Sequence, residues 1–481
     1  MSFSIHFISI FPLIRNFIVG LQERLNLTRR ILGFPTGITV LITYSSTRPL
    51  PSESSLRDRV TELQHHFPLL YSEIRGIDTR EPYFQQRSTL WDPSDILQRR
   101  GYQPAQDKSK VLLDELERSQ KEDISVRPIW QISIYISGEN RPAYLTVSVD
   151  HVLLDGMGLL FLIYALLSPD ISHLPSDTLP TIPRMEDTID TRPSYTYLIP
   201  IAWRELFLPK LPMFLQNYFK TPLSWPDDDF AIAPTKVPQG SSLLEIPYDI
   251  MDALKRVGKT HGISTLHPTM MTAYLVAMWA VLKPKREPLV LRGAMPRSER
   301  DSKLGHPYCS ANYISHLQYD KTFAPTDDFW TEAEGASTLM NSAVAKKNAL
   351  GEMGLLAYVP DSDPKKTKFN PGPTGWEEFF HRAGESSTPF RDSLAFSNLG
   401  YVDLPQGAED MIWTQGSWPS GAALIACVVG HKGGLRIVTV WRDGSAVMRE
   451  QVREVERVFE KVLKRLMQSE GEATLAKLVR S

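Results

Sequence analysis

The sequence predicts an α/β protein of two domains, and three features support this prediction. With 481 residues, the chain is long enough for two domains of ordinary size, each with its own core. Apolar and polar residues alternate along 130–136 and 144–149, as they do in strands. Apolar residues recur at helical spacing in 159–167 and 452–466. The presence of both element types indicates mixed α/β domains.

The same patterns predict the remaining elements. Helices are expected at 56–67, 266–282 and 330–348, and strands at 289–295, 394–397, 422–429 and 435–441. The strand at 130–136 is expected to pair with the one at 144–149. Residues 169–238 contain twelve prolines, which favours a long crossover. We therefore expect an N-terminal domain at 1–185, a crossover at 186–240 and a C-terminal domain at 241–481.

The amino-acid composition restricts which binding partners and which cellular compartment we expect for this protein. The formal net charge is −2 and no basic stretch is long enough to form a stripe, so nucleic acid is not an expected partner. Cys309 and Cys427 cannot form a disulfide framework, which favours a reducing compartment, and neither has the local signature of a nucleophile. No transmembrane span is visible in the sequence. We expect a cytoplasmic monomer, with peripheral attachment to the endoplasmic reticulum or a lipid droplet as the alternative.

Two apolar segments are candidates for surface contacts. Met1–Leu21 has apolar residues at helical steps, so we expect a helix docked on the body of the protein, with peripheral membrane contact as the alternative. This segment lacks the basic region and the cleavage site of a signal peptide. Ile199–Tyr218 is expected to pack on the surface as broken helices, with a lid or a membrane-contacting helix as alternatives.

The segment His151-Val152-Leu153-Leu154-Asp155-Gly156 carries the strongest chemical signal. It lies between the strand pattern at 144–149 and the helix pattern at 159–167. If the alternation of the strand continues, His151 lies on its apolar face and Asp150 on the other face. A histidine at a strand end, with a carboxylate one helical turn later, suits a general base and its structural support.

Other interpretations of these residues stay open. A histidine on an apolar face can be an ordinary core residue, and Asp155 can cap the helix that follows it. We expect Gly156 and Gly158 to let the backbone turn tightly beside the imidazole. A metal site would need further ligands at matched spacing, and the sequence offers none next to His151.

The motif resembles the active-site motif of the chloramphenicol acetyltransferase-like superfamily, which includes CoA-dependent acyltransferases and peptide-synthetase condensation domains. The similarity is greatest to the fungal and yeast alcohol acetyltransferases. Segments in matching order extend it over most of the chain: Glu23–Arg30 with Gly37–Tyr44, His66–Leu70, Ala294–Arg300 and Phe396–Gly400.

The resemblance implies two chloramphenicol acetyltransferase-like domains with an active-site tunnel between them. Acyl-CoA, such as acetyl-CoA, would enter from one face, and a small hydroxylated acceptor from the other. His151 would act as general base in a ternary complex, with no acyl-enzyme, no bound cofactor and no metal. Gly156 would complete the motif, and Asp155 would be structural, paired with Arg300 or, as second choice, with Arg297.

The resemblance also implies a donor for the oxyanion of the tetrahedral intermediate. Ser397 and Asn398 match a strand-end element that supplies hydroxyl or amide donors in the superfamily, and an ordinary turn is the alternative. The residues that contact CoA and the identity of the acceptor do not follow from the sequence.

Two alternative functions stay open. The first is condensation chemistry, in which an amide or ester forms from a carrier-bound or amine substrate. Condensation domains usually have a second histidine directly before the catalytic one, and Asp150 occupies that position here. The second is a catalytically silent binding protein of the same fold. The intact His151, Asp155 and Gly156 argue against it.

Overall fold

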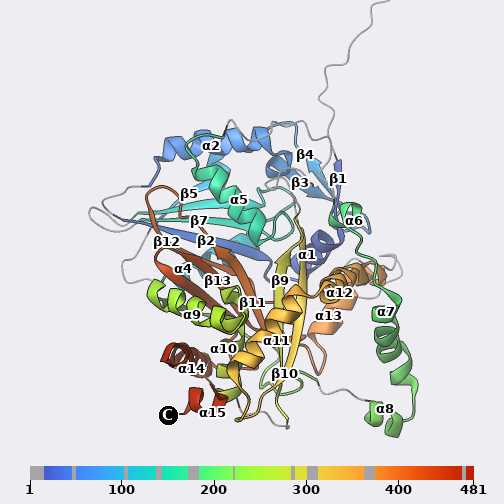
Figure 1. Ribbon diagram of the computed structural model, residues 1–481. Helices are drawn as coiled ribbons and strands as arrows, with labels where there is room; N and C mark the ends of the chain where they lie inside the picture. Colours follow the sequence, from blue (N-terminus) through green and yellow to red (C-terminus); the bar gives the residue numbers. More distant parts are fainter. Residues whose placement is uncertain are drawn as a thin grey trace, which may run out of the picture.

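The computed structural model describes most of the chain, and its elements form two lobes, each built on a mixed sheet with flanking helices (Figure 1). The predicted α/β class is therefore confirmed. The described residues are 16–45, 50–101, 107–136, 143–171, 184–219, 223–282, 288–300, 312–361, 374–468 and 473–480.

The N-terminal lobe is built on a five-stranded sheet in the order β12-β2-β7-β6-β5. The strands are β2 (Gly37–Tyr44), β5 (Leu97–Gly101), β6 (Trp130–Ile136), β7 (Ala143–Asp150) and β12 (Ala408–Gln415). β6 and β7 pair antiparallel as predicted, whereas β5 runs parallel to β6. Helix α4 packs against β2 and β7, and α2 and α5 lie on the opposite side of the sheet in Figure 1. The helices of this lobe are α1 (Leu21–Ile31), α2 (Glu53–His66), α3 (Pro93–Ile96), α4 (Lys108–Lys121) and α5 (Gly156–Leu167).

Both faces of β7 are buried, so its alternating polar residues do not face solvent. The Thr39 hydroxyl of β2 lies 2.8 Å from the Ser148 hydroxyl of β7, which satisfies one such pair inside the lobe. A smaller sheet, in the order β1-β4-β3, lies beside the main one. Its strands are β1 (Asn16–Ile18), β3 (Ser72–Arg75) and β4 (Tyr83–Gln86).

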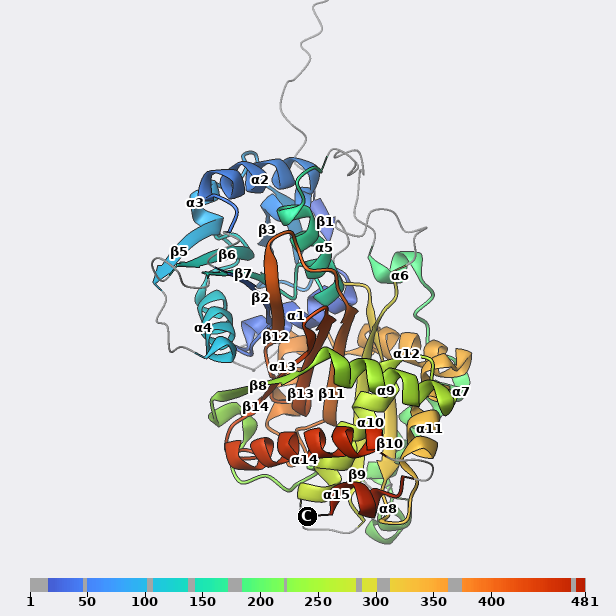
Figure 2. The same cartoon turned by 60° about the vertical axis from the view of Figure 1, so that its left-hand side comes forward.

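The C-terminal lobe is built on a six-stranded sheet in the order β10-β9-β11-β13-β14-β8. Helices α9, α10 and α14 pack on one another and against this sheet (Figure 2). The strands are β8 (Gln239–Ile246), β9 (Val290–Ser298), β10 (Ile314–Thr322), β11 (Asp392–Tyr401), β13 (Ala422–His431) and β14 (Gly434–Arg442). The helices are α9 (Tyr248–Thr260), α10 (Leu266–Val281), α11 (Phe329–Asn341), α12 (Ala343–Gly354), α13 (Gly375–Gly384), α14 (Arg449–Gln468) and α15 (Leu475–Val479).

One strand links the two lobes. β12 belongs to the second half of the sequence, yet it pairs antiparallel with β2 at the edge of the N-terminal sheet, where Trp413 lies opposite Val40 (Figure 1). The domain boundaries that we expect from the sequence, at 185 and 241, stay a prediction.

The predicted helix at 330–348 is wrong in one respect, because two helices occupy this region. α11 ends at Asn341, and Ser342 begins the next helix: its hydroxyl accepts a hydrogen bond from the Ala345 backbone N–H at 3.2 Å. Serine is a preferred N-cap, so its side chain competes with a continuous helix.

The N-terminal helix expected at Met1–Leu21 is wrong at its C-terminal end. Phe17 lies in β1, buried against β4, and Leu21 is the first residue of α1. Residues 1–15 lie outside the described residues, and membrane contact by this segment stays a prediction. In the described parts of the chain, no helix is long and apolar enough to cross a bilayer.

The described residues of the crossover and the residue before it form the short α-helices α6 (Met185–Thr188), α7 (Tyr195–Ala202) and α8 (Met213–Phe219). Between α7 and α8 the backbone forms a π-helical turn at Trp203–Phe207 and a 3₁₀ turn at Leu208–Lys210. The predicted broken helices are therefore present.

Candidate active site

His151 directly follows β7, and three separate parts of the chain hold its backbone. Its N–H donates to the carbonyl of Thr36 at 2.9 Å. Its carbonyl accepts one hydrogen bond from the amide of Asn26, on α1, at 3.1 Å and another from the amide of Asn312 at 2.8 Å. The residue is 9% exposed. These bonds fix the point from which the imidazole projects.

Asn312 also determines which ring nitrogen of His151 carries the proton. Because the Nδ2 group of Asn312 donates to the His151 carbonyl, its Oδ1 is the atom that lies 2.7 Å from His151 Nδ1. An amide oxygen can only accept, so Nδ1 is protonated and donates. In the neutral imidazole Nε2 then has a lone pair, and no described residue bonds to it.

The surroundings of the ring favour its neutral form. Burial lowers the pKa of His151 below its ordinary value of 6.5, and the nearby Arg29 guanidinium lowers this pKa further. The carboxylate of Asp155 acts in the opposite direction but is the smaller influence. Near neutral pH, the imidazole is therefore able to accept a proton at Nε2.

His151 lines a narrow cavity of about 50 Å³ where the two lobes meet. The ends of β9 and β11 and the strand β12 supply most of the other lining residues, including Ser397, Asn398 and Trp413. Asn398 also lines a cavity of about 650 Å³ between α9, α10 and the end of β11. The two cavities therefore share the lining residue Asn398.

Asp155 both caps the helix that follows it and pairs with an arginine, the two roles considered for it from the sequence. Its Oδ1 accepts from the Gly158 N–H at 2.8 Å, which caps α5. Its Oδ2 lies 2.7 Å from Nη1 of Arg300 and accepts from the Tyr313 N–H at 2.9 Å. Both oxygens are engaged, so this carboxylate does not serve as a second base.

Arg300 rather than Arg297 is the partner of Asp155. Arg297 lines the cavity and forms an ion pair with Glu299 at 2.8 Å. The Arg300 side chain is 9% exposed, and its guanidinium also lies 5.7 Å from the centre of the Tyr313 ring.

The role expected for the two glycines needs correction. Neither Gly156 nor Gly158 has a positive φ, so the turn does not require them. Both lie in close contact with neighbouring side chains. A Cβ on Gly156 would lie 3.0 Å from the Leu399 side chain, and a Cβ on Gly158 would lie 3.1 Å from Arg300 Nη2. They allow α5 to pack directly on the C-terminal lobe.

Ser397 and Asn398 lie on β11 at the cavity, but their side chains differ in availability. The Asn398 amide is engaged, because Oδ1 accepts from the Gly400 N–H at 2.8 Å and Nδ2 lies 3.3 Å from His267 Nδ1. Gly400 has a φ of 83°, so this turn requires glycine. The Ser397 hydroxyl has no hydrogen-bond partner among the described residues. Ser397 is therefore the better candidate donor.

Asp150 points away from His151 and is buried in a structural cluster. Its Oδ2 lies 2.8 Å from Nη1 of Arg30 and accepts from the Thr36 hydroxyl at 2.6 Å, while Oδ1 accepts from the Val152 N–H at 2.9 Å. The position directly before the candidate base therefore holds a paired carboxylate.

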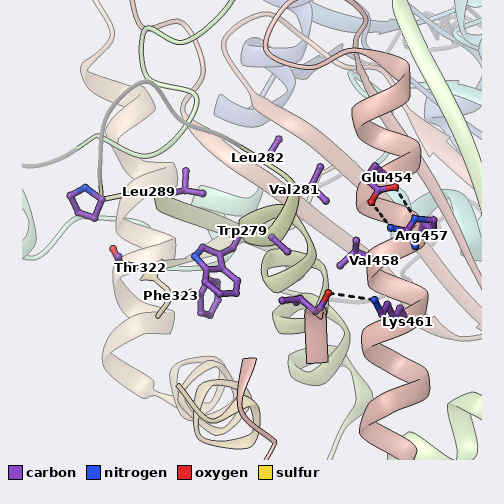
Figure 3. Close-up of a pocket in the computed structure, with 13 residues that line it drawn as sticks. Trp279, Val281, Leu282, Leu289, Thr322, Phe323, Glu454, Arg457, Val458 and Lys461 are labelled. Atoms are coloured by element: carbon purple, nitrogen blue, oxygen red, sulfur yellow. Dashed lines mark hydrogen bonds and ion pairs between the residues drawn. The ribbon is translucent and has the colours of Figure 1, made fainter. Parts of the chain in front are cut away.

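Neither the cysteines nor a second large cavity shows an arrangement of catalytic side chains like the one at His151 among the described residues. Burial raises the pKa of the Cys427 thiol to about 12, which disfavours the thiolate that a nucleophile requires, and Cys309 lies outside the described residues. A cavity of about 580 Å³ between α10, β10 and α14 shares no lining residue with the His151 cavity (Figure 3). Its rim is occupied by the Glu454–Arg457 ion pair and by Lys461, whose Nζ lies 3.5 Å from the Val479 carbonyl.

Sequence reasoning missed three residues that hold the site. Asn312 and Asn26 hold His151, and the Glu23 carboxylate accepts from the Asn312 backbone N–H at 2.8 Å. Glu23 and Asn26 lie in the segment Glu23–Arg30, which the sequence singled out only for its resemblance to the superfamily. Asn312 belongs to none of the motifs identified in the sequence. The feature that could have marked it as a site residue is its position just before a strand.

We expect the Asp155–Arg300 pair to contribute to the stability of the fold rather than to take part directly in catalysis. Asp155→Ala and Arg300→Ala should each lower the free energy of unfolding by about 3–5 kcal/mol, because each removes an oppositely charged partner from a charge that is largely shielded from water. Asp155→Asn, which retains an acceptor for the Gly158 N–H, should lose less than Asp155→Ala. Denaturant unfolding would measure all three.

The double variant provides the control for this expectation. Because the two residues are in contact, Asp155→Ala with Arg300→Ala should destabilise the protein less than the sum of the single changes. Additive losses would show that the pair does not interact. Full stability of Asp155→Ala together with lost activity would make Asp155 a direct partner of His151 in catalysis.

Comparisons with known proteins give a fold but no sequence family. No family model matches the chain, and no curated protein matches it. Among solved structures, the chain is similar to the epimerization domain from the third module of tyrocidine synthetase B. The two sequences are 11% identical, the alignment covers 97% of this chain and 98% of that chain, and the TM-score is 0.60. It is also similar to the condensation domain of the monacolin K polyketide synthase, with 9% identity, 95% and 98% covered, and a TM-score of 0.59.

An acetyltransferase of solved structure has a similar fold. Trichothecene 15-O-acetyltransferase from Fusarium sporotrichioides is 11% identical, with 93% of each chain covered and a TM-score of 0.62. Identities this low show the fold alone. The chain therefore has the two-lobed chloramphenicol acetyltransferase-like fold of this epimerization domain, this condensation domain and this O-acetyltransferase.

Proposed function

We propose that this chain is an O-acyltransferase that moves an acyl group, in the first instance acetyl, from acyl-CoA to the hydroxyl of a small alcohol or secondary metabolite. The observation that carries the proposal is the state of His151. Burial favours the neutral form of its ring, and Nδ1 is bonded to Asn312. No described residue bonds to Nε2, which leaves it for a substrate proton beside a cavity between the lobes. The fold shared with an O-acetyltransferase supports the same chemistry.

In the proposed reaction, His151 Nε2 takes the proton of the acceptor hydroxyl as its oxygen attacks the thioester carbonyl. The C–O bond forms, and the carbonyl oxygen becomes an oxyanion that accepts a hydrogen bond from Ser397. Collapse of this intermediate breaks the C–S bond, and the imidazolium returns the proton to the leaving thiolate. Positioned base catalysis of this kind is typically worth roughly 10²–10⁴ in rate.

The cavities suit a reaction in which both substrates are bound at once. The cavity at His151, about 50 Å³, is large enough only for reacting atoms, whereas the neighbouring cavity of about 650 Å³ is of the size that binds small molecules. Holding the two reactants in one geometry lowers the barrier without an acyl-enzyme.

Condensation chemistry is the second candidate, because one of the similar structures is a condensation domain. The paired, buried Asp150 argues against it, since this position lacks the second histidine typical of condensation domains and its carboxylate is bonded to Arg30 and Thr36. A silent binding protein is the third candidate. A binding role alone does not explain why Asn312 holds the imidazole in one tautomer while no described residue bonds to Nε2.

A thiol-release assay with acetyl-CoA separates these functions. Panels of alcohols and amines should be compared with and without enzyme, and release should be acceptor-dependent with alcohols. His151→Ala should fold normally and turn over at least about 10²-fold more slowly, because the general base is lost. Preference for amines would favour condensation chemistry, and equal rates for the wild type and His151→Ala would exclude His151 as the base.

The pH dependence should report the protonation of His151. Burial lowers its pKa, so the imidazole stays neutral, and kcat/KM should stay constant, until the pH falls below 6.5. Asn312→Asp should move this acid limb to higher pH, because a carboxylate at Nδ1 stabilises the imidazolium. Asn312→Ala should lower kcat without that move.

Glu23→Gln is the control, since Glu23 also contacts Asn312 and burial raises its pKa to about 7. The limb should persist in this variant. If it disappears in Glu23→Gln or stays in place in Asn312→Asp, the limb does not belong to His151.

The oxyanion donor can be tested by comparing two neighbours. Ser397→Ala should lower kcat by about 10²–10³, the typical cost of one lost oxyanion donor. Asn398→Ala should cost less, because its amide is bonded to Gly400 and lies beside His267. If Ser397→Ala changed only the KM for acetyl-CoA, Ser397 would belong to substrate binding instead.

A further inference from the structure

Residues 195–219, which we call the arm, carry an unusual amount of exposed apolar surface. No residue of α7 is buried. Nine of the twenty large hydrophobic side chains that are exposed among the described residues belong to the arm, although it is a small part of the chain. They include Tyr195 at 81%, Met213 and Phe214 at 70% each, and Tyr218 at 80% exposure. Single exposed hydrophobics are normal, but a cluster of this size indicates a binding surface.

The arm folds on itself rather than into a lobe. Trp203 stacks on Phe207 with ring centres 6.0 Å apart and meets Phe219 edge-on at 6.3 Å. The Gln216 amide donates to the carbonyls of Pro209 and Leu211 at 3.2 and 2.7 Å. Figure 1 shows α7 and α8 standing at the edge of the C-terminal lobe. The apolar surface is therefore preformed and does not require a partner to order it.

One side of the arm anchors it, and the other side faces outward. Tyr197 is half-buried, and its hydroxyl lies near Glu352 of α12 and Arg391. Tyr195 and Ile199, two residues away on either side, are exposed. The anchor holds the arm beside α12 with its apolar side chains toward solvent.

The chemistry of this surface fits a membrane. The arm contains seven aromatic residues and just three charged ones, Arg204, Glu205 and Lys210. Aromatic rings are enriched at the level of lipid headgroups, and the two cations suit anionic headgroups. Both cations are exposed. A lipid surface accepts an irregular apolar protrusion, whereas a protein partner needs a groove of matching shape.

We propose that the arm docks this protein on the surface of a lipid bilayer, with Met213, Phe214 and Ile199 inserted below the headgroups. α7 and α8 have eight and seven residues, which is too short to span a bilayer, so the arm lies in the interface. The contact is peripheral and reversible, and it does not rest on the proposed catalytic function.

Vesicle co-sedimentation of the full chain tests this docking. The vesicles are phosphatidylcholine with a minor share of phosphatidylserine. The wild type should sediment with them and stay in the supernatant without them. The arm variant Met213→Ser/Phe214→Ser should partition roughly tenfold less, since two large apolar side chains no longer enter the lipid. The matched control Val344→Ser/Tyr358→Ser removes two exposed hydrophobics outside the arm and should bind like the wild type.

The remaining outcomes also decide the question. Equal partitioning of the wild type and the arm variant, with matching melting temperatures, would overturn the proposal, even if another segment binds lipid. Failure of the wild type to bind would overturn it as well. Self-association of the wild type without vesicles that is lost in the arm variant would assign the arm to a second copy instead. Binding should decline only modestly in high salt, because the arm has two cations, and complete loss would contradict apolar insertion.

Discussion

The hydrogen bond between Asn312 and His151 is the interaction on which the candidate site depends. It is a double contact, because the same side-chain amide holds the backbone carbonyl and the ring of the histidine. Asn312 belongs to the C-terminal lobe and His151 to the N-terminal lobe, so the contact closes the interface at the point of chemistry. If the lobes separated, the proton on Nδ1 would lose its partner, and the ring would be free to rotate or change tautomer.

Buried charges arranged around this contact hold the lobes in register. α1 supplies several of them: Arg30 pairs with Asp150, Arg24 donates to the Thr374 hydroxyl at 3.0 Å, and Glu23 accepts from Asn312. Asp155 and Arg300 form the corresponding bridge on the other side of His151. Buried ion pairs add little net stability over apolar residues of the same shape, but breaking one is costly. Their effect here is to penalise any arrangement in which α1, β7 and the C-terminal lobe are displaced.

The sequence predicted the elements with strong periodicity and the residues within short motifs. α10, α14 and the pair β6–β7 follow from their apolar patterns, and the Asp155–Arg300 contact followed from resemblance. The break at Ser342 was missed because a local side-chain cap outcompetes an unbroken helical pattern. Strand β12 and residue Asn312 were missed for another reason: their partners are distant in sequence, so no local pattern marks them. The glycines of the motif were misread because close packing, rather than a turn, is what requires them.

The most direct test of the account is to observe the ring nitrogens of His151 themselves. Selective ¹⁵N labelling of histidine, with His151→Ala to assign the signal, reports the tautomer and the pKa by nuclear magnetic resonance. We expect a proton on Nδ1 at neutral pH, no proton on Nε2, and a pKa of His151 below 6.5. A proton on Nε2, or an imidazolium that persists at neutral pH, would contradict it.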